Sequence, residues 1–104
     1  MAEVIAVVHL EAQGYRIAAR NWRTASGEVD IIARRDDLVV FVEVKARDNE
    51  DAALMAVSRE SQRRIEAAGQ DWIMQQADGG RLSWRNDVVA VLRGRETRHF
   101  EDVW

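Results

Sequence analysis

Two acidic residues and the only lysine of the chain lie in two neighbouring segments that otherwise have the composition of β-strands. Asp30 belongs to the segment 28–34, and Glu43 and Lys45 belong to the segment 38–46. Side chains two positions apart in a strand project from the same face of a sheet. Glu43 and Lys45 therefore share a face, and Glu28 shares a face with Asp30.

A two-residue turn at Asp36-Asp37 predicts that these strands form an antiparallel hairpin with Asp30 directly opposite Glu43. Directly opposed residues have Cβ atoms about 4.5–5.5 Å apart, and two carboxylates at that separation repel each other unless a cation lies between them. Lys45 supplies part of the required charge, and a divalent cation such as Mg²⁺ supplies the rest. The alternative is a buried salt-bridge cluster without chemistry. Burying each ion is costly, which favours the functional interpretation.

Apolar periodicity and turn residues predict the elements that position these side chains, in the order α-β-β-β-α-β-β. They are a helix over 2–13, strands over 15–23, 28–34 and 38–46, a polar loop over 48–53, a helix over 58–76, and strands over 84–92 and 97–104. A meander followed by a crossover helix places the next strand parallel to part of the meander. The predicted fold class is therefore α/β (α+β), a central mixed β-sheet flanked by helices, in one domain that spans residues 1–104.

The segment 38–46 is apolar on both faces apart from Glu43 and Lys45, so we expect it to be the central strand of the sheet. Apolar stripes on the two helices are expected to pack on this sheet. They comprise Val4, Ile5, Val8 and Ala12 in the first helix, and Ile65, Ala68, Trp72 and Ile73, with Ser61 at the edge, in the second.

The composition limits the possible functions. The chain has 104 residues, a net charge of −3 and a pI of about 5.4, which excludes a protein that coats nucleic acid with a basic surface. It has no cysteine, and no segment long and apolar enough for a membrane span. The N-terminal residues lack the basic region of a signal peptide. We therefore expect a cytoplasmic protein without contact to membranes.

The two charged segments resemble a known motif. Gly27-Glu28-Val29-Asp30 followed by the sequence FVEVK at 41–45 resembles the D…(D/E)-x-K motif of the restriction-endonuclease-like superfamily, which includes archaeal-type Holliday-junction resolvases. More closely, the chain is similar to the YraN-like family of predicted endonucleases. The similarity extends nearly from end to end, through GYRI and ARNWR at 14–23, GEVDIIARR at 27–35, QRRI at 62–65, NDVVAVL at 86–92 and RHFEDVW at 98–104.

This resemblance implies a restriction-endonuclease-like αβββαβ core that hydrolyses phosphodiester bonds of DNA, branched or single-stranded, with Mg²⁺ as the cofactor and Mn²⁺ as its substitute. Asp30, Glu43 and the backbone carbonyl of Val44 would be the metal ligands. Lys45 would orient or deprotonate the attacking water or neutralise charge in the transition state, and Glu3 would reach the same pocket from the first helix. Glu28 is expected at the rim. We predict nucleic-acid contacts for Gln62, Arg63, Arg64 and Arg47.

The chain departs from the family pattern at one position of the second helix. Ser61 stands where the family usually has a lysine just before the QRR sequence. This replacement removes one candidate phosphate contact, and it puts efficient cleavage in doubt more than the existence of the site.

Several other polar and aromatic residues have a structural interpretation. We expect His9 and His99 to be structural, and Asp87 to form hydrogen bonds near the site rather than to bind metal. Trp72 and Trp84 are expected to pack in the core. Trp22 is equally compatible with packing and with stacking on a base.

Three functions remain open at this point. The first is a metal-dependent deoxyribonuclease, and the second is a nucleic-acid-binding module that keeps the nuclease fold without cutting. The third is a structural or partner-binding domain whose terminal strand over 97–104 pairs with another chain. A homodimer formed through that apolar strand is compatible with each of them.

Overall fold

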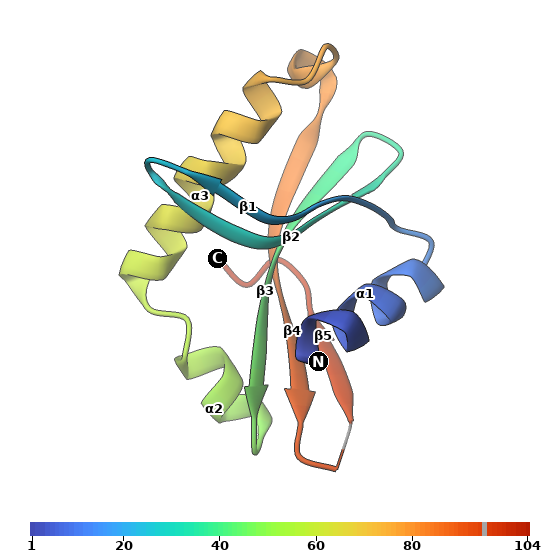
Figure 1. Cartoon of the computed structure of the whole chain (residues 1–104), viewed down its shortest axis with the longest axis vertical. Helices are drawn as coiled ribbons and strands as arrows, with labels where there is room; N and C mark the ends of the chain where they lie inside the picture. The colour runs from blue at the N-terminus through green and yellow to red at the C-terminus, as the bar shows by residue number, and fades with distance from the viewer. Residues whose placement is uncertain (95) are drawn as a thin grey trace.

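A five-stranded mixed sheet separates two helical layers (Figure 1). The computed structural model describes residues 1–94 and 96–104. The elements are α1 (Ala2–Ala12), β1 (Arg16–Thr24), β2 (Gly27–Arg35), β3 (Leu38–Arg47), α2 (Glu50–Met55), α3 (Arg59–Met74), the 3₁₀ turn η1 (Gly79–Arg81), β4 (Ser83–Leu92) and β5 (Thr97–Phe100). The strands lie in the order β1-β2-β3-β4-β5. The predicted fold class is confirmed.

The central strand is β3, as its two apolar faces predict. It pairs antiparallel with β2 on one side and parallel with β4 on the other. Val39 and Phe41 face a core beneath α3, whereas Val40 and Val42 face a second core beneath α1. Each face of β3 is therefore covered by a different helix, and the two helices lie on opposite sides of the sheet (Figure 1).

The ends of the helices are determined by local sequence. The Ser58 hydroxyl accepts a hydrogen bond from the backbone N–H of Ser61 at the start of α3, and the Asn49 side chain accepts one from Ala52 at the start of α2. Gly14 follows α1 with φ +90°, a conformation that glycine adopts without strain.

The buried face of α3 agrees with the apolar stripe predicted for this helix. Ile65, Ala68, Trp72 and Ile73 are all buried against the sheet. Gly69 also lies on this face, because a Cβ atom there would come within 2.8 Å of the Phe41 ring. The missing side chain allows the helix to lie directly on the central strand. The expectation that Trp84 packs in the core is wrong, because this residue at the start of β4 is 48% exposed.

The predicted stripe on α1 is wrong. The side chains that are buried are Ala6 and Leu10, whereas Val4 is 49% exposed and Val8 is 62% exposed. Apolar residues occupy every position from 4 to 8. The periodicity of the sequence therefore does not determine which side of the helix contacts the sheet.

The structure also corrects two predicted segments, the loop over 48–53 and the strand over 97–104. The expected polar loop over 48–53 contains the start of the short helix α2, which Asn49 caps. The expected strand over 97–104 ends at Phe100, because the chain then turns at Asp102, which has φ +54°. The side chain of Asp87 binds the N–H of Asp102 at 2.9 Å and holds this turn.

No helix in the described ranges 1–94 and 96–104 has both the length and the apolar composition needed to cross a membrane.

Candidate active site

The candidate site lies where β2 separates from β3. Pairing between these strands runs from Arg35 opposite Leu38 to Ile31 opposite Val42, the register that the Asp36-Asp37 turn predicts. At the next position the side chain of Asp30 accepts a hydrogen bond from the N–H of Val44 at 2.9 Å. Beyond the end of the β2–β3 pairing, the side-chain carboxylate of Asp30 therefore accepts the hydrogen bond from β3 that a backbone carbonyl of β2 would otherwise accept.

Glu43 is the most strongly perturbed acid of the site. Burial raises the pKa of its carboxyl group to about 8, with further contributions from a hydrogen bond with Asp30 and from the charges of Asp30 and Glu28. The charge of Lys45 acts in the opposite direction and does not compensate. The two carboxyl groups are therefore close enough to interact strongly, as the predicted register requires.

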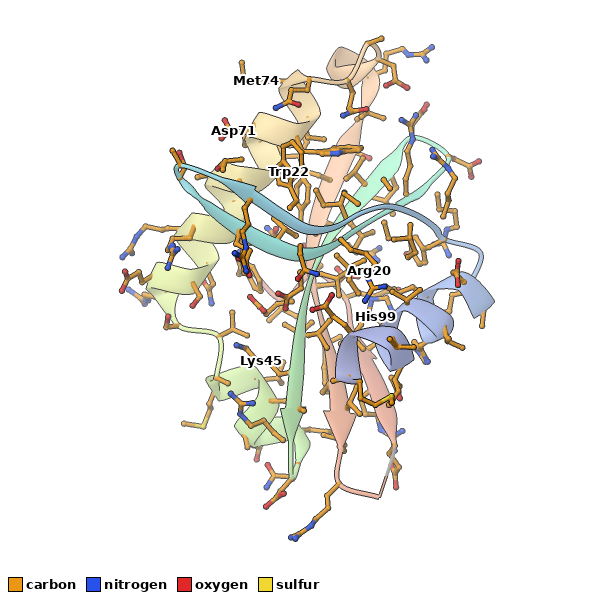
Figure 2. The ribbon with its side chains drawn as sticks, viewed as in Figure 1. Arg20, Trp22, Lys45, Asp71, Met74 and His99 are labelled. Atoms are coloured by element: carbon orange, nitrogen blue, oxygen red, sulfur yellow. The ribbon has the colours of Figure 1, made fainter. Side chains whose placement is uncertain are left out.

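Lys45 lies beside this pair. Its Nζ atom is 4.0 Å from Oε1 of Glu43, and its side chain is 21% exposed. Figure 2 shows Lys45 on the side of β3 that faces α2. The structure thus brings Asp30, Glu43 and Lys45 together, as the sequence predicts, at a position open to solvent.

Two hollows share a wall that is formed by the carboxyl groups of Glu28, Asp30 and Glu43, here called the acidic wall. The first, the α3 hollow, has a volume of about 180 Å³ and is completed by Ser61, Arg64 and Ile65 of α3. The second, the α1 hollow, has a volume of about 520 Å³, and its lining includes Glu3, Val44 and Lys45. The acidic wall is therefore accessible from two directions.

Glu28 lies at the rim of the site, as expected, with its side chain 37% exposed. It lines both hollows beside Asp30, and its carboxylate pairs with the guanidinium group of Arg23 on the adjacent strand. The sequence signal was present, since Glu28 and Asp30 are two residues apart in one strand.

Glu3 reaches the α1 hollow from the first turn of α1, as predicted. Its Oε1 atom is 3.5 Å from Nη2 of Arg20 in β1. This ion pair connects the start of α1 to the first strand. Arg20 was not recognised from the sequence, because no short-range pattern relates the two residues.

The donor atoms at the acidic wall fit a hard cation. Asp30 and Glu43 supply only oxygen atoms, and these two carboxyl groups repel each other when both are ionised. In the described part of the chain no group of three or more His, Asp or Glu side chains is close enough to hold a metal ion. A bound Mg²⁺ ion would therefore also need other ligands, such as backbone oxygen, water or substrate phosphate.

The four residues that were predicted to contact nucleic acid lie at different distances from the acidic wall. Arg64 lines the α3 hollow, whereas its neighbour Arg63 is exposed on α3 and lines neither hollow. The Gln62 amide donates to the carbonyl of Val57 at 3.5 Å. Arg47 donates to the carbonyl of Ala46 at 2.8 Å, away from the acidic wall. Of these four residues, only Arg64 lies at the site.

The hairpin of β1 and β2 is held against α3 at its tip. A Cβ atom at Gly27 would lie 2.1 Å from the carbonyl oxygen of Arg64, so only glycine permits this contact. The indole N–H of Trp22 donates to the carbonyl of Ala68 at 3.0 Å. These contacts fix Glu28 beside Arg64, and they favour packing rather than base stacking for Trp22.

Asp87 forms hydrogen bonds, as expected, but its side chain lies on the face of the sheet opposite that of Glu43 and lines neither hollow, so its expected position near the site is wrong. It is fully buried, and it binds Nε2 of His99 at 2.6 Å and Nη2 of Arg85 at 2.7 Å. His99 lies beneath α1 (Figure 2). Strand parity explains the error: Asp87 is paired with Val42, whose side chain faces α1, whereas Glu43 faces the other way.

The two histidines have structural surroundings, as expected. Nδ1 of His99 is 3.1 Å from Oε1 of Gln13, and Nε2 of His9 is 2.7 Å from Nε2 of the same glutamine. The Gln13 side chain thus bridges α1 and β5.

Comparison with known proteins places these features in a family. Residues 2–91 match the model of a family described as "Uncharacterised protein family UPF0102". A UPF0102 protein of Rhizobium leguminosarum bv. trifolii (strain WSM2304) is 56% identical over all 104 residues, which cover 85% of that protein. A UPF0102 protein of Mesorhizobium japonicum is 55% identical over 102 residues, 98% of this chain and 82% of that protein. One of Brucella canis is 52% identical over 98 residues, 94% of this chain and 78% of that protein.

Proposed function

The chain belongs to the uncharacterised protein family UPF0102, and on this premise we propose that it is a Mg²⁺-dependent endonuclease that hydrolyses phosphodiester bonds of DNA. The observation that carries the proposal is the meeting of Asp30, Glu43 and Lys45 at one solvent-accessible position. Oxygen ligands beside a fixed ammonium group suit the charge that develops during phosphoryl transfer.

Each residue has a defined task in this proposal. Asp30 and Glu43 would hold the metal ion, whose chemistry is to lower the pKa of water and to stabilise negative charge on the phosphate. Asp30 is kept in place for this task by the N–H of Val44. The Lys45 ammonium group would hold the attacking water or neutralise charge on the phosphate.

Glu3 has a supporting task. It lines the α1 hollow together with Lys45 and accepts a hydrogen bond from Arg20 at 3.5 Å. Because this hydrogen bond leaves the second carboxylate oxygen of Glu3 available, that oxygen can position a water molecule in the hollow.

The test is cleavage of branched, nicked and single-stranded DNA in the presence of Mg²⁺ or Mn²⁺. We expect the unaltered protein to cut at least one of them and Lys45→Ala to cut none, because the variant lacks the fixed cation. Arg81→Ala is the matched control, since it removes an exposed positive charge far from the acidic wall. Cleavage that is equal in all three proteins would indicate a contaminating nuclease and contradict the proposal.

A second candidate is a module that binds nucleic acid at the same site without cutting it. The observation that favours it is the shortage of positive charge, because the net charge is −3 and Ser61 contributes only a hydroxyl group to the α3 hollow. Metal-dependent DNA binding without any cleavage by the unaltered protein would support this candidate.

A further inference from the structure

The acidic wall divides two hollows that differ in their positive charge. The α1 hollow contains Lys45, and the α3 hollow contains Arg64. These two cations therefore approach the same carboxylates from different elements and different directions. A substrate that spans the wall would meet one cation on each side.

Arg64 is available to a ligand. In the part of the chain that the structure describes, no carboxylate oxygen lies within 4.0 Å of its guanidinium group, whereas the nearby Glu28 is paired with Arg23. Helical side chains lean toward the start of their helix, so the side chain of Arg64 extends over the turn that contains Ser61. The Ser58 hydroxyl donates to Oγ of Ser61, which leaves the Ser61 proton available to an acceptor in the hollow.

The α3 hollow is small for a base or a drug-sized ligand. Its volume of about 180 Å³ lies below the roughly 300–1,000 Å³ of typical small-molecule pockets. A phosphate group has the charge and hydrogen-bonding capacity that a guanidinium group and a hydroxyl group recognise. The size of the hollow fits a single phosphate group. Because the carboxyl groups of the acidic wall also line the hollow and would repel an anion, Arg64 and Ser61 would hold a phosphate there only when the proposed metal ion offsets the charge of the wall.

We propose that the α3 hollow is the subsite for a phosphate that flanks the cleaved phosphodiester, held by Arg64 and Ser61 while the cleaved phosphate lies at the Lys45 side of the acidic wall. This inference rests on the proposed function. It assigns the direction in which a DNA strand crosses the site, from the start of α1 toward α3. It also separates Arg64 from Arg63, which lies about 100° around the helix and lines neither hollow.

The position of Arg64 is built into the fold. The tip of the β1–β2 hairpin contacts the carbonyl oxygen of Arg64 at Gly27, and the following residue, Glu28, forms part of the acidic wall. The helix and the wall are thus held at a constant separation, as a subsite next to a cleavage position requires.

The experiment combines a protein variant with a substrate in which single charges are removed. The probes are single-stranded, nicked and four-way-junction DNA, each with one methylphosphonate, an uncharged linkage, placed in turn at the successive linkages of one strand; the cleavage assay shows which of these linkages flank the cleaved bond. Binding is measured in Ca²⁺, and cleavage in Mg²⁺. Arg63→Ala is the matched control for Arg64→Ala, and melting temperatures show whether each variant is folded.

We expect Arg64→Ala to weaken DNA binding about tenfold, which corresponds to the loss of a hydrogen-bonded charge contact, and Arg63→Ala to have a much smaller effect. At one flanking linkage, a methylphosphonate should weaken binding by the unaltered protein but have no further effect on Arg64→Ala. Arg64→Lys should recover part of the affinity, because it restores the charge without the paired hydrogen bonds.

Two results would overturn the inference. One is equal binding by Arg64→Ala and Arg63→Ala, and the other is a methylphosphonate effect that adds to that of Arg64→Ala at every linkage. If Lys45 proves essential for cleavage while either result holds, the proposed function stands and the subsite is wrong. If the unaltered protein never cuts but shows the non-additive linkage, Arg64 binds a phosphate of DNA, and both the nuclease proposal and the placement of that phosphate beside a cleaved bond are wrong.

Discussion

At the scale of single residues, the charge of the site depends on whether the carboxyl group of Glu43 is protonated. Burial and the neighbouring carboxylates raise its pKa to about 8, although Lys45 lowers it. In the absence of metal, Glu43 therefore keeps its proton at neutral pH. Binding of a divalent cation would release that proton, so the proposed metal affinity should increase as the pH rises toward 8.

Glu43 should also make the stability of the metal-free protein depend on pH. In the unfolded chain its carboxyl group ionises near its ordinary pKa of 4.5, whereas in the folded protein it ionises only near 8. Between these values the folded state binds more protons, so the contribution of Glu43 to the free energy of unfolding falls as the pH rises. Glu43→Gln removes this group, and we expect the variant to gain stability relative to the unaltered protein from pH 5 to pH 8.

This prediction is checked by urea unfolding of both proteins at several pH values in the presence of a chelator. The quantity of interest is the difference between their free energies of unfolding, because the other titrating groups are common to both. A difference that stays constant between pH 5 and pH 8 would show that the pKa of Glu43 is not raised.

At the scale of elements, the site depends on how the β1–β2 hairpin meets α3. Gly27→Ala would place a Cβ atom 2.1 Å from the carbonyl oxygen of Arg64, and this backbone atom cannot move aside like a side chain. We expect a loss of stability of about 1–3 kcal/mol, the usual range for overpacking. Because the hairpin carries Glu28 and Asp30, DNA cleavage should fall as well.

Gly80→Ala is the control for this substitution. It adds the same methyl group at a glycine with no heavy atom within 4 Å of the added Cβ, so its stability should change little. Both variants are compared by urea unfolding and by the cleavage assay. Equal stability of Gly27→Ala and Gly80→Ala would mean that the hairpin tip does not contact α3 as closely as described.

At the scale of the whole molecule, Asp87 connects elements that are distant in the sequence. Its carboxylate binds Arg85 in its own strand, His99 in β5 and the N–H of Asp102 beyond β5. Arg85 also donates to the hydroxyl of Tyr15 at 3.0 Å, which extends the network to the residue before β1. Asp87 is thus the common anchor for the two ends of the chain.

We expect Asp87→Ala to lower the free energy of unfolding by about 3 kcal/mol or more, because it leaves Arg85 without its buried partner. Asp37→Ala serves as the control. Asp37 is mostly exposed and lies 3.7 Å from Arg34, so its loss should change stability by less than about 1 kcal/mol. The two variants are compared by urea unfolding at pH 7.

The effect of Asp87 also has a predictable pH range. Burial alone would raise the pKa of its carboxyl group, but the hydrogen bonds from His99, Arg85 and Asp102 and the charge of Arg85 outweigh burial and lower it below 3.8. Its stabilising contribution is therefore complete above that value and is lost as the pH falls further. A difference between the unaltered protein and Asp87→Ala that is unchanged from pH 7 to pH 2 would contradict this assignment.

The sequence alone determined the elements of the sheet and the register of its central hairpin. The alternation of side chains, the two-residue turn at Asp36-Asp37 and the apolar segment 38–46 are local features. They place Asp30 beside Glu43. The structure confirms the register from Arg35 opposite Leu38 to Ile31 opposite Val42, and Asp30 and Glu43 meet just beyond the end of this pairing. Local signals suffice here because the pleat of a strand and the length of a turn leave few alternatives.

Only the tertiary structure decided which surfaces meet. The contact of α1 through Ala6 and Leu10, the position of Asp87 on the far face and the separation of Arg64 from Arg63 depend on how whole elements pack. Each of these features joins residues far apart in the chain, and the near-uniform apolar sequence of α1 left its orientation undetermined. Packing selects among such alternatives by shape and buried area, which no short segment of sequence encodes.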